Sequence, residues 1–344
     1  MSLRIAITAD PYLPVPPRLY GGIERVVSLL AAGLVRRGHE VTLIAHPDSH
    51  TPATLIGYGA PPHTGTSARV RELFQVGSAL VRLSGAIDVI HSFGRLAALA
   101  PVLPLRRVKK IQSYQREIPW TGVRRAARVA GDSIRFTGCS TSLYASANGL
   151  AGGTRWNTVF NCVDPASYVA VTNVGDAAPL AFLGRIERIK GTHTAIEIAR
   201  AAGRPLVIAG NVADAGYFRT EVAPHIDGRM VSYIGEVDDE AKSRLLGRSA
   251  ALLMPIEWDE PFGIVMAEAF ACGTPVVGFG RGSVPEVVRD GVNGFVVHTV
   301  AEAARAVQDL VRIDRAAVRR DCEERFSCDA IVAAYEALYR EAVG

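Results

Sequence analysis

Two carboxylates and a helix start occur together in an acidic motif between residues 258 and 268. The motif reads Trp-Asp-Glu-Pro-Phe-Gly-Ile-Val-Met-Ala-Glu and follows an apolar, strand-like run. Its proline and glycine indicate a turn, after which a helix begins. Glu260 then lies at the end of the strand, and Glu268 lies about two turns into the helix. One carboxylate can meet a sugar and the other a ribose diol, although acids near a helix start also serve as solvated complements of the helix dipole.

The same helix start presents backbone N–H groups to solvent. The amides of Gly263, Ile264 and Val265 have no partner inside the helix, and the positive end of the helix dipole adds to their attraction for anions. We therefore expect a phosphate to bind at this point.

A basic loop supplies a second candidate phosphate contact. Residues 182–191 read Phe-Leu-Gly-Arg-Ile-Glu-Arg-Ile-Lys-Gly, an apolar strand followed by a loop. Arg185 and Lys190 can clamp a departing diphosphate, and each such contact contributes about 3 kcal/mol by analogy with a single oxyanion donor. Taken alone, two loop cations are equally well explained as solvated surface groups, and Arg188 is interpreted as one.

The front half of the chain carries weaker signals. Gly21 and Gly22 precede an amphipathic helix, so that backbone can approach a ligand there, but an ordinary loop is the simpler explanation. His91 ends the run Asp-Val-Ile-His and is expected at the carboxyl end of a strand, pointing toward a ligand. A histidine there suits contact with sugar hydroxyls or proton transfer, and a structural role stays open.

The elements that must position these residues alternate between strand-like runs and helical patterns. The alternation occurs once before about residue 160 and again after a linker at 162–178. It predicts an α/β protein with two Rossmann-like domains, each a doubly wound parallel sheet, with residues 47–67 rich in loops. We assign residues 1–170 to the first domain, 171–326 to the second and 327–344 to a terminal helix. Because ligands bind outside the carboxyl ends of parallel strands, we expect the two sheets to face each other across a cleft.

Charge is distributed unevenly along the chain. Residues 1–170 contain 19 Lys and Arg against 9 Asp and Glu, a net charge of +10, whereas the remainder, with 19 against 25, has −6. The basic half is expected to meet a phosphorylated acceptor or an anionic membrane, and a solvated basic face explains it equally well. Nucleic acid is not expected as a partner, because no binding motif accompanies the charge.

The sequence lacks the patterns of several other classes of protein. No Asp-x-Asp pair and no metal-ligand spacing of His or Cys is found, so neither a metal nor a cofactor is expected. Five cysteines without a Cys-x-x-Cys pair indicate reduced, mostly buried thiols. No leader pattern precedes the first strand-like run, so we expect a cytoplasmic protein. The basic front half adds the expectation of peripheral contact at the inner face of the membrane.

Taken together, these motifs resemble those of the retaining glycosyltransferases of family 4, which have the GT-B fold. The resemblance is strongest over 180–294, through the Gly-Arg and Lys-Gly pairs, the Glu-Pro-Phe-Gly motif and Gly-Thr-Pro-Val-Val-Gly at 273–278. It implies transfer of a hexose from a nucleotide diphosphate sugar, with a uridine diphosphate (UDP) sugar as the default donor. The acceptor it implies is a small molecule, a saccharide or a lipid-linked molecule.

The resemblance also implies roles for individual residues. Arg185 and Lys190 would bind the donor diphosphate, Glu260 would act at the transferred sugar, and Glu268 would hold the ribose hydroxyls. The further contacts would come from the backbone of Phe262 to Val265, from Gly22 and from His91, and the terminal helix would cross back to the first domain. Retention would follow from front-face substitution, although a double displacement stays open. Acceptor contacts are expected near Arg18, Tyr20, Arg95, Tyr114, Arg116 and Trp120.

Other functions are compatible with the same architecture. A nucleotide-sugar epimerase or a phosphorylase would also use two facing Rossmann-like domains. A protein that binds a nucleotide-sugar without catalysis is a third alternative, which the intact donor motifs disfavour.

Overall fold

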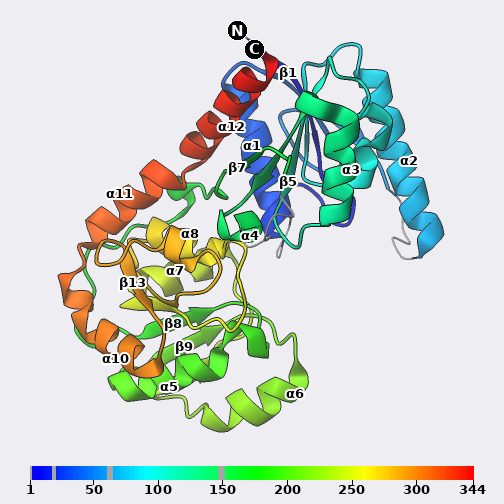
Figure 1. Ribbon diagram of the computed structural model, residues 1–344. Coiled ribbons are helices and arrows are strands. Elements are labelled where there is room, and N and C mark those ends of the chain that lie inside the picture. The colour runs from blue at the N-terminus through cyan, green and yellow to red at the C-terminus, as the bar shows by residue number, and fades with distance from the viewer. Residues whose placement is uncertain (1, 18–20, 60–64, 146–151) are drawn as a thin grey trace. The chain divides into compact units, whose positions relative to one another are not determined.

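The computed structural model describes residues 2–17, 21–59, 65–145 and 152–344. Contacts divide the chain into unit 1, which comprises Met1–Cys162 and Cys328–Gly344, and unit 2, which comprises Val163–Ser327 (Figure 1). The expected boundary at residue 170 lies later than this division. Residues before it already bond to unit 2, because the amide of Val169 donates to Ser243 Oγ at 3.2 Å.

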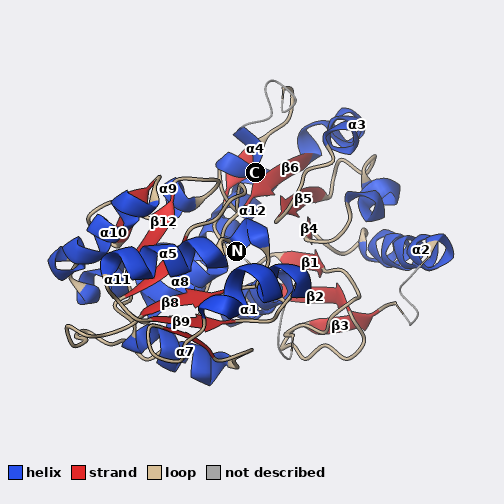
Figure 2. Cartoon of the chain, turned by 90° about the horizontal axis from the view of Figure 1, so that it is seen from below, coloured by secondary structure: helices blue, strands red, loops and turns tan. Residues whose placement is uncertain are grey.

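Unit 1 contains a parallel sheet that, in the described residues, has seven strands in the order β3-β2-β1-β4-β5-β6-β7. Figure 2 shows strands β3 to β6 side by side in this order. The strands are β1 (Arg4–Thr8), β2 (Glu40–Ala45), β3 (Thr54–Gly57), β4 (Val89–Ser92), β5 (Lys109–Tyr114), β6 (Ile134–Gly138) and β7 (Trp156–Thr158). Strand β3 lies in the stretch expected to be rich in loops, where residues 47–53 and 58–59 are indeed in loops, and it adds a short strand that the sequence did not predict. Its four residues are too few to show a reliable alternation in sequence.

The helices of unit 1 include the C-terminal helix of the chain. They are α1 (Gly22–Arg36), α2 (Thr66–Leu83), α3 (Trp120–Ala130), α4 (Ser142–Ala145) and α12 (Cys328–Val343), with the 3₁₀ segment η1 (Leu96–Val102). Helix α12 lies against α1, and just beyond α1 Arg37 forms an ion pair with Glu336 at 3.0 Å (Figure 1). The last residues of the chain therefore complete the first unit.

Unit 2 contains a second parallel sheet, with six strands among the described residues in the order β10-β9-β8-β11-β12-β13. The strands are β8 (Leu180–Leu183), β9 (Leu206–Ala209), β10 (Val231–Tyr233), β11 (Ala251–Met254), β12 (Val276–Phe279) and β13 (Gly294–Val297). The helices are α5 (Thr192–Ala202), α6 (Ala215–Tyr217), α7 (Asp239–Arg248), α8 (Ile264–Ala271), α9 (Val284–Val287), α10 (Val300–Gln308) and α11 (Arg315–Arg325). The prediction of two doubly wound parallel sheets is thus confirmed.

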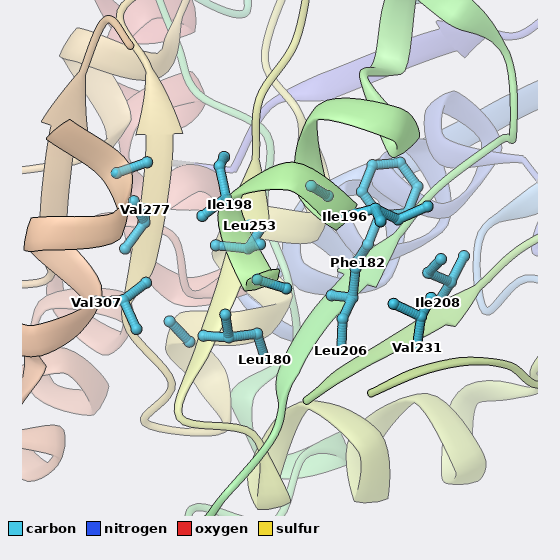
Figure 3. Close-up of a cluster of buried hydrophobic side chains, with 14 of the residues drawn as sticks. Leu180, Phe182, Ile196, Ile198, Leu206, Ile208, Val231, Leu253, Val277 and Val307 are labelled. Carbon is cyan, nitrogen blue, oxygen red and sulfur yellow. The ribbon is translucent and has the colours of Figure 1, made fainter. Parts of the chain in front are cut away.

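Apolar side chains from strands and helices fill the core of unit 2. Leu180 and Phe182 of β8 lie among Ile196 and Ile198 of α5 and Leu253 of β11 (Figure 3). All five side chains are at most 3% exposed. Burial of this kind fixes the strand ends, and therefore the loops that follow them, relative to one another.

The strand order of each sheet reverses direction at one place. In unit 1 the reversal falls between β1 and β4, and in unit 2 it falls between β8 and β11. The loops that leave two such strands diverge to opposite sides of the sheet, which opens a crevice for a ligand at the carboxyl ends. In unit 2 these are the loops that contain the basic and the acidic motifs.

The two loops at this reversal approach each other through Gly191. Its backbone is left-handed, with φ of 73°, and a Cβ atom at this position would lie 2.0 Å from the carbonyl oxygen of Pro255. Only glycine fits this contact. The amide of Glu257 donates to the carbonyl of Ile189 at 2.9 Å and joins the loops a second time.

We predict that Gly191→Ala lowers the free energy of unfolding by about 3 kcal/mol, because it combines left-handed strain with a steric clash. Gly203→Ala is the matched control, since Gly203 has φ of 66° and no atom within 4 Å of its Cβ position. This control substitution should lower the free energy of unfolding by only about 1 kcal/mol. Urea unfolding followed by circular dichroism measures both, and equal losses would contradict the close contact.

Candidate functional site

Lys190 and Glu260 meet at the carboxyl edge of the sheet in unit 2. Lys190 Nζ lies 2.5 Å from Glu260 Oε2, and both side chains are mostly buried, at 16% and 11% exposed. Trp258 Nε1 also donates to Glu260 Oε2 at 3.1 Å, and the ammonium group lies 4.8 Å from the centre of the indole ring. The structure therefore brings together two predicted site residues and adds Trp258, whose role the sequence did not indicate.

Arg185 lies in the same basic loop with a different partner. Its Nη2 forms an ion pair with Glu187 Oε1 at 2.7 Å, and its side chain is 39% exposed. Arg188 pairs with Glu221 at 3.0 Å and covers the ring of Tyr217. Both arginines are partly exposed, and they differ in their partners: Arg185 pairs within its own loop, whereas Arg188 joins the loop to Tyr217 and Glu221.

Glu268 lies in the second turn of α8 and is 5% exposed. Its Oε1 accepts hydrogen bonds from Lys242 Nζ at 2.6 Å and from Tyr168 Oη at 2.9 Å. Burial alone would lower the pKa of Lys242, but the carboxylates of Glu268 and Asp239 together outweigh burial and raise this pKa. Lys242 therefore stays charged. Neither partner was identified from the sequence, because both lie far from Glu268 along the chain and follow no motif.

The start of α8 has the features expected of an anion site. Gly263 caps the helix in a left-handed conformation, with φ of 70°, no side chain accepts from the first turn, and that turn contains no acidic residue. The positive end of the helix dipole is thus uncompensated next to Ile264 and Val265. The side chain of Phe262 is only 2% exposed and packs on Phe326, so that only its backbone is available to a ligand.

The loop after β12 braces the acidic motif. The amide of Ser283 donates to the carbonyl of Glu260, and its hydroxyl donates to the carbonyl of Phe262, both at 2.9 Å. These bonds hold the backbone of the motif against the neighbouring strand end.

A pocket of about 560 Å³ lies in unit 1, at the carboxyl ends of β1, β4 and β5. Arg95, Tyr114 and Arg116, three of the residues expected near the acceptor, line it. Trp120 begins α3 beside the pocket, whereas Arg18 and Tyr20 lie outside the described residues.

Three charged groups, Asp10, Arg95 and Arg116, line the polar end of this pocket. Arg116 forms an ion pair with Asp10 at 3.1 Å, and burial raises the pKa of Asp10. The guanidinium group of Arg95 lies 5.3 Å from the centre of the Tyr12 ring.

Gly22 begins α1 with no atom within 4 Å of its Cβ position, so that backbone is open to a ligand there.

His91 contradicts the expectation that it points toward a ligand. It is fully buried, with Nδ1 at 2.6 Å from Tyr339 Oη and Nε2 at 2.6 Å from Ser113 Oγ. Its ring faces the side of β4 that α12 covers, where Tyr335 also packs on it. The residue that lines the pocket is Phe93, just after the strand. His91 therefore joins β4, β5 and α12 and does not reach a substrate.

The described residues contain no group of three or more His, Cys, Asp or Glu side chains arranged to hold a metal ion. Among the same residues, no helix is both long and apolar enough to span a membrane.

Comparisons with known families match both units of the chain. The family described as "Glycosyl transferases group 1" matches residues 171–325, and the family described as "Glycosyltransferase Family 4" matches residues 20–135. The first match contains Arg185, Lys190, Glu260 and Glu268.

Known proteins are similar to this chain over much of its length. Glycogen synthase of Mycobacterium tuberculosis strain H37Rv is 28% identical over 92% of this chain and 88% of its own. D-inositol 3-phosphate glycosyltransferase of Mycobacterium leprae strain TN is 33% identical over 49% of this chain and 43% of its own. The crystal structure of AviGT4, a glycosyltransferase involved in avilamycin A biosynthesis, aligns with a TM-score of 0.76 and 27% identity, covering 99% of this chain and 98% of that one.

Burial of His91 predicts a pH dependence of stability. Burial lowers its pKa to about 3, whereas an unfolded histidine has a pKa of about 6.5. Below about pH 6.5 the unfolded chain therefore binds a proton that the folded chain excludes. As the pH decreases below this value, His91 alone should lower the free energy of unfolding by about 1.4 kcal/mol per pH unit. The groups around the ring, Ser113, Tyr335, Tyr339 and Phe93, do not change charge in this range.

Urea unfolding between about pH 7 and about pH 5 measures this slope. His91→Gln should flatten the slope, and the control His298→Gln, at an exposed histidine of unit 2, should leave it unchanged. The same slope in all three proteins would show that His91 becomes protonated in the folded state.

Proposed function

Because this chain belongs to glycosyltransferase family 4 and has the GT-B fold, we propose that it transfers a hexose from a UDP-sugar to an acceptor hydroxyl, with retention at the anomeric carbon and without a metal ion. The observation that supports this most directly is the mostly buried pair of Lys190 and Glu260 at the point where the strand order of unit 2 reverses. A UDP-hexose is the default donor within the family. The nucleotide-sugar is a co-substrate, so no cofactor is proposed.

Lys190 and Glu260 supply opposite charges at one point. In the unbound protein each neutralises the other, which offsets the cost of removing both groups from water. When a donor binds, the ammonium group can turn to the diphosphate and the carboxylate can accept hydrogen bonds from the sugar. As the sugar–phosphate bond lengthens, negative charge grows on the phosphate, and Lys190 stabilises that charge more strongly than it stabilises the ground state.

The remaining positive groups of the site surround the same phosphate. Arg185 extends from the basic loop, and the uncapped amides at the start of α8 add the positive end of a helix dipole. These fixed groups take the part that a divalent cation has in metal-dependent transferases. This arrangement supports metal independence.

Glu268 is proposed to hold the ribose hydroxyls of the donor. Its contacts with Lys242 and Tyr168 fix the carboxylate on the side of α8 that faces α7. A carboxylate is a strong acceptor for hydroxyl groups, and the charged hydrogen bond from Lys242 holds its orientation. Lys242 and Tyr168 are therefore positioning residues for the nucleotide.

Front-face substitution accounts for retention without a covalent intermediate. Glu260 is the carboxylate closest to the proposed sugar site, but the indole of Trp258 donates to its Oε2 and lowers its nucleophilicity after Lys190 has turned to the diphosphate. The acceptor hydroxyl would instead attack on the face from which the diphosphate departs. Its proton would pass to the leaving phosphate, and His91 has no part in that transfer.

Lys190→Ala should reduce kcat by about 100- to 1000-fold, by analogy with loss of one oxyanion donor, because the growing charge on the phosphate loses its nearest cation. Arg188→Ala, which alters a cation of the same loop paired with Glu221, is the matched control and should keep kcat within about twofold. Initial rates of UDP release measure both. Full turnover by the Lys190 variant would remove this residue from the mechanism.

The same assay, followed by proton NMR, tests the other parts of the proposal. The anomeric proton of the product should show the configuration of the donor, and a chelator should leave the rate unchanged. An inverted product or loss of the rate with the chelator would contradict retention or metal independence. Parallel reactions with ADP- and GDP-sugars show whether UDP is the preferred nucleotide.

Peripheral contact of unit 1 with an anionic membrane is also part of the proposal, and helix α2 is the surface that supports it. Val70, Phe74 and Val81 lie on one side of α2 and are 60%, 74% and 46% exposed. Residues 65–130 contain twelve Lys and Arg and three Asp and Glu. Exposed apolar groups among cations are typical of helices that lie in the membrane interface.

The double variant Val70→Ser, Phe74→Ser should weaken binding to vesicles of phosphatidylglycerol at least tenfold, because Phe74 no longer enters the interface. Val311→Ser is the control, since Val311 of unit 2 is 90% exposed outside this surface. Flotation at low and high salt measures the binding. No flotation of the unaltered protein at low salt would exclude the contact.

A further inference from the structure

The pocket of unit 1 has a polar end and an apolar trough. The polar end lies at the strand ends, where Asp10, Gln112 and Arg116 line it. The trough runs away from the strand ends between η1 and α3, and its walls include Leu103 of the segment after η1 and Val129 of α3. A pocket that changes from polar to apolar along its length matches a ligand with two chemically different parts.

Small side chains create the trough. On one wall Ala97 and Ala100 of η1 are exposed, and on the other Gly122 and Ala126 of α3 face the same space. Residues 122, 126 and 129 recur at the spacing of one helix face. They cover about 10 Å along α3 at the rise of an α-helix. Larger residues at these positions would fill the space between the two walls.

A cation without a partner stands on the wall of the trough. Arg125 lines the pocket and is exposed, and its side chain makes no hydrogen bond or ion pair within the described part of the chain. Arg116, at the polar end, is already paired with Asp10. An anionic group on the ligand would supply the counter-charge that Arg125 lacks.

We infer that this pocket binds an acceptor of a particular class, an anionic amphiphile, with its hydroxyl-bearing part at the strand ends and its apolar part between η1 and α3. The inference rests on the proposed transferase function and adds the chemistry of the acceptor. The anionic group, a phosphate or a carboxylate, contacts Arg125. A purely polar saccharide would leave the apolar walls in contact with water and gain nothing from them.

Titration calorimetry of the full-length chain with n-alkyl phosphates, from butyl to octyl, tests this inference. Each added methylene group should tighten binding about fourfold, which corresponds to burial of one methylene, until the chain fills the trough. Inorganic phosphate should bind far more weakly than octyl phosphate. Equal affinity for all of these probes would overturn the inference and would indicate a site for the anion alone.

Three variants locate the binding. Ala100→Phe should abolish the dependence on chain length, because the new ring occupies the trough, whereas Ala201→Phe, at an exposed alanine of α5, should preserve it. Arg125→Ala should weaken the binding of every alkyl phosphate about tenfold, and the ratio of affinities between chain lengths should stay unchanged. An unchanged chain-length dependence in Ala100→Phe would overturn the assignment to this trough.

A second titration separates this inference from the proposed function. UDP should bind the unaltered protein and the Ala100→Phe variant with the same affinity. If UDP binds but longer alkyl chains bind no more tightly than shorter ones, the inferred class of acceptor is wrong and the proposed donor site is unaffected. Absence of UDP binding would contradict the proposed donor site, whatever the alkyl phosphates do.

Discussion

The close approach of Gly191 to the carbonyl oxygen of Pro255 places Lys190 beside Glu260. Two strands that neighbour each other in the sheet send their loops to opposite sides, and without a contact between the loops the charged residues would separate. A glycine in a left-handed conformation lets the loops touch. The mostly buried ion pair then forms next to the start of α8, where we propose that the donor diphosphate binds.

The polar groups of unit 1 fall into a buried set and a set that lines the pocket. His91, Ser113 and Tyr339 satisfy one another in a buried network that ties the C-terminal helix to the centre of the sheet. These groups support the strand ends but cannot reach a ligand. The polar groups that line the pocket, such as Asp10 and Arg116, lie on the loops beyond those strand ends. In this unit the buried network therefore supports the structure, whereas the loops form the pocket.

The two ligands proposed for unit 1, an amphiphilic acceptor and an anionic membrane, share their chemistry. The trough between η1 and α3 combines apolar walls with Arg125, and α2 exposes Phe74 among arginines. Segment η1 packs against α2 and also against α3. An acceptor drawn from a membrane would meet the same chemistry at the surface and in the pocket, which is consistent with the excess of positive charge in the front half of the chain.

The sequence by itself determined the two sheets, because the alternation of apolar strands and amphipathic helices is a local property of the chain. It also predicted that Lys190 and Glu260 lie close together, since both residues lie in loops that follow strands and belong to recognisable motifs. The tertiary structure decided the features that neither the hydrophobic periodicity nor the motifs encode. His91 proved to be buried because α12, almost 250 residues later, covers its side of β4. The partners of Glu268 and the trough between η1 and α3 arise from contacts between distant segments, whose free energy depends on packing in three dimensions and leaves no pattern in the order of residues.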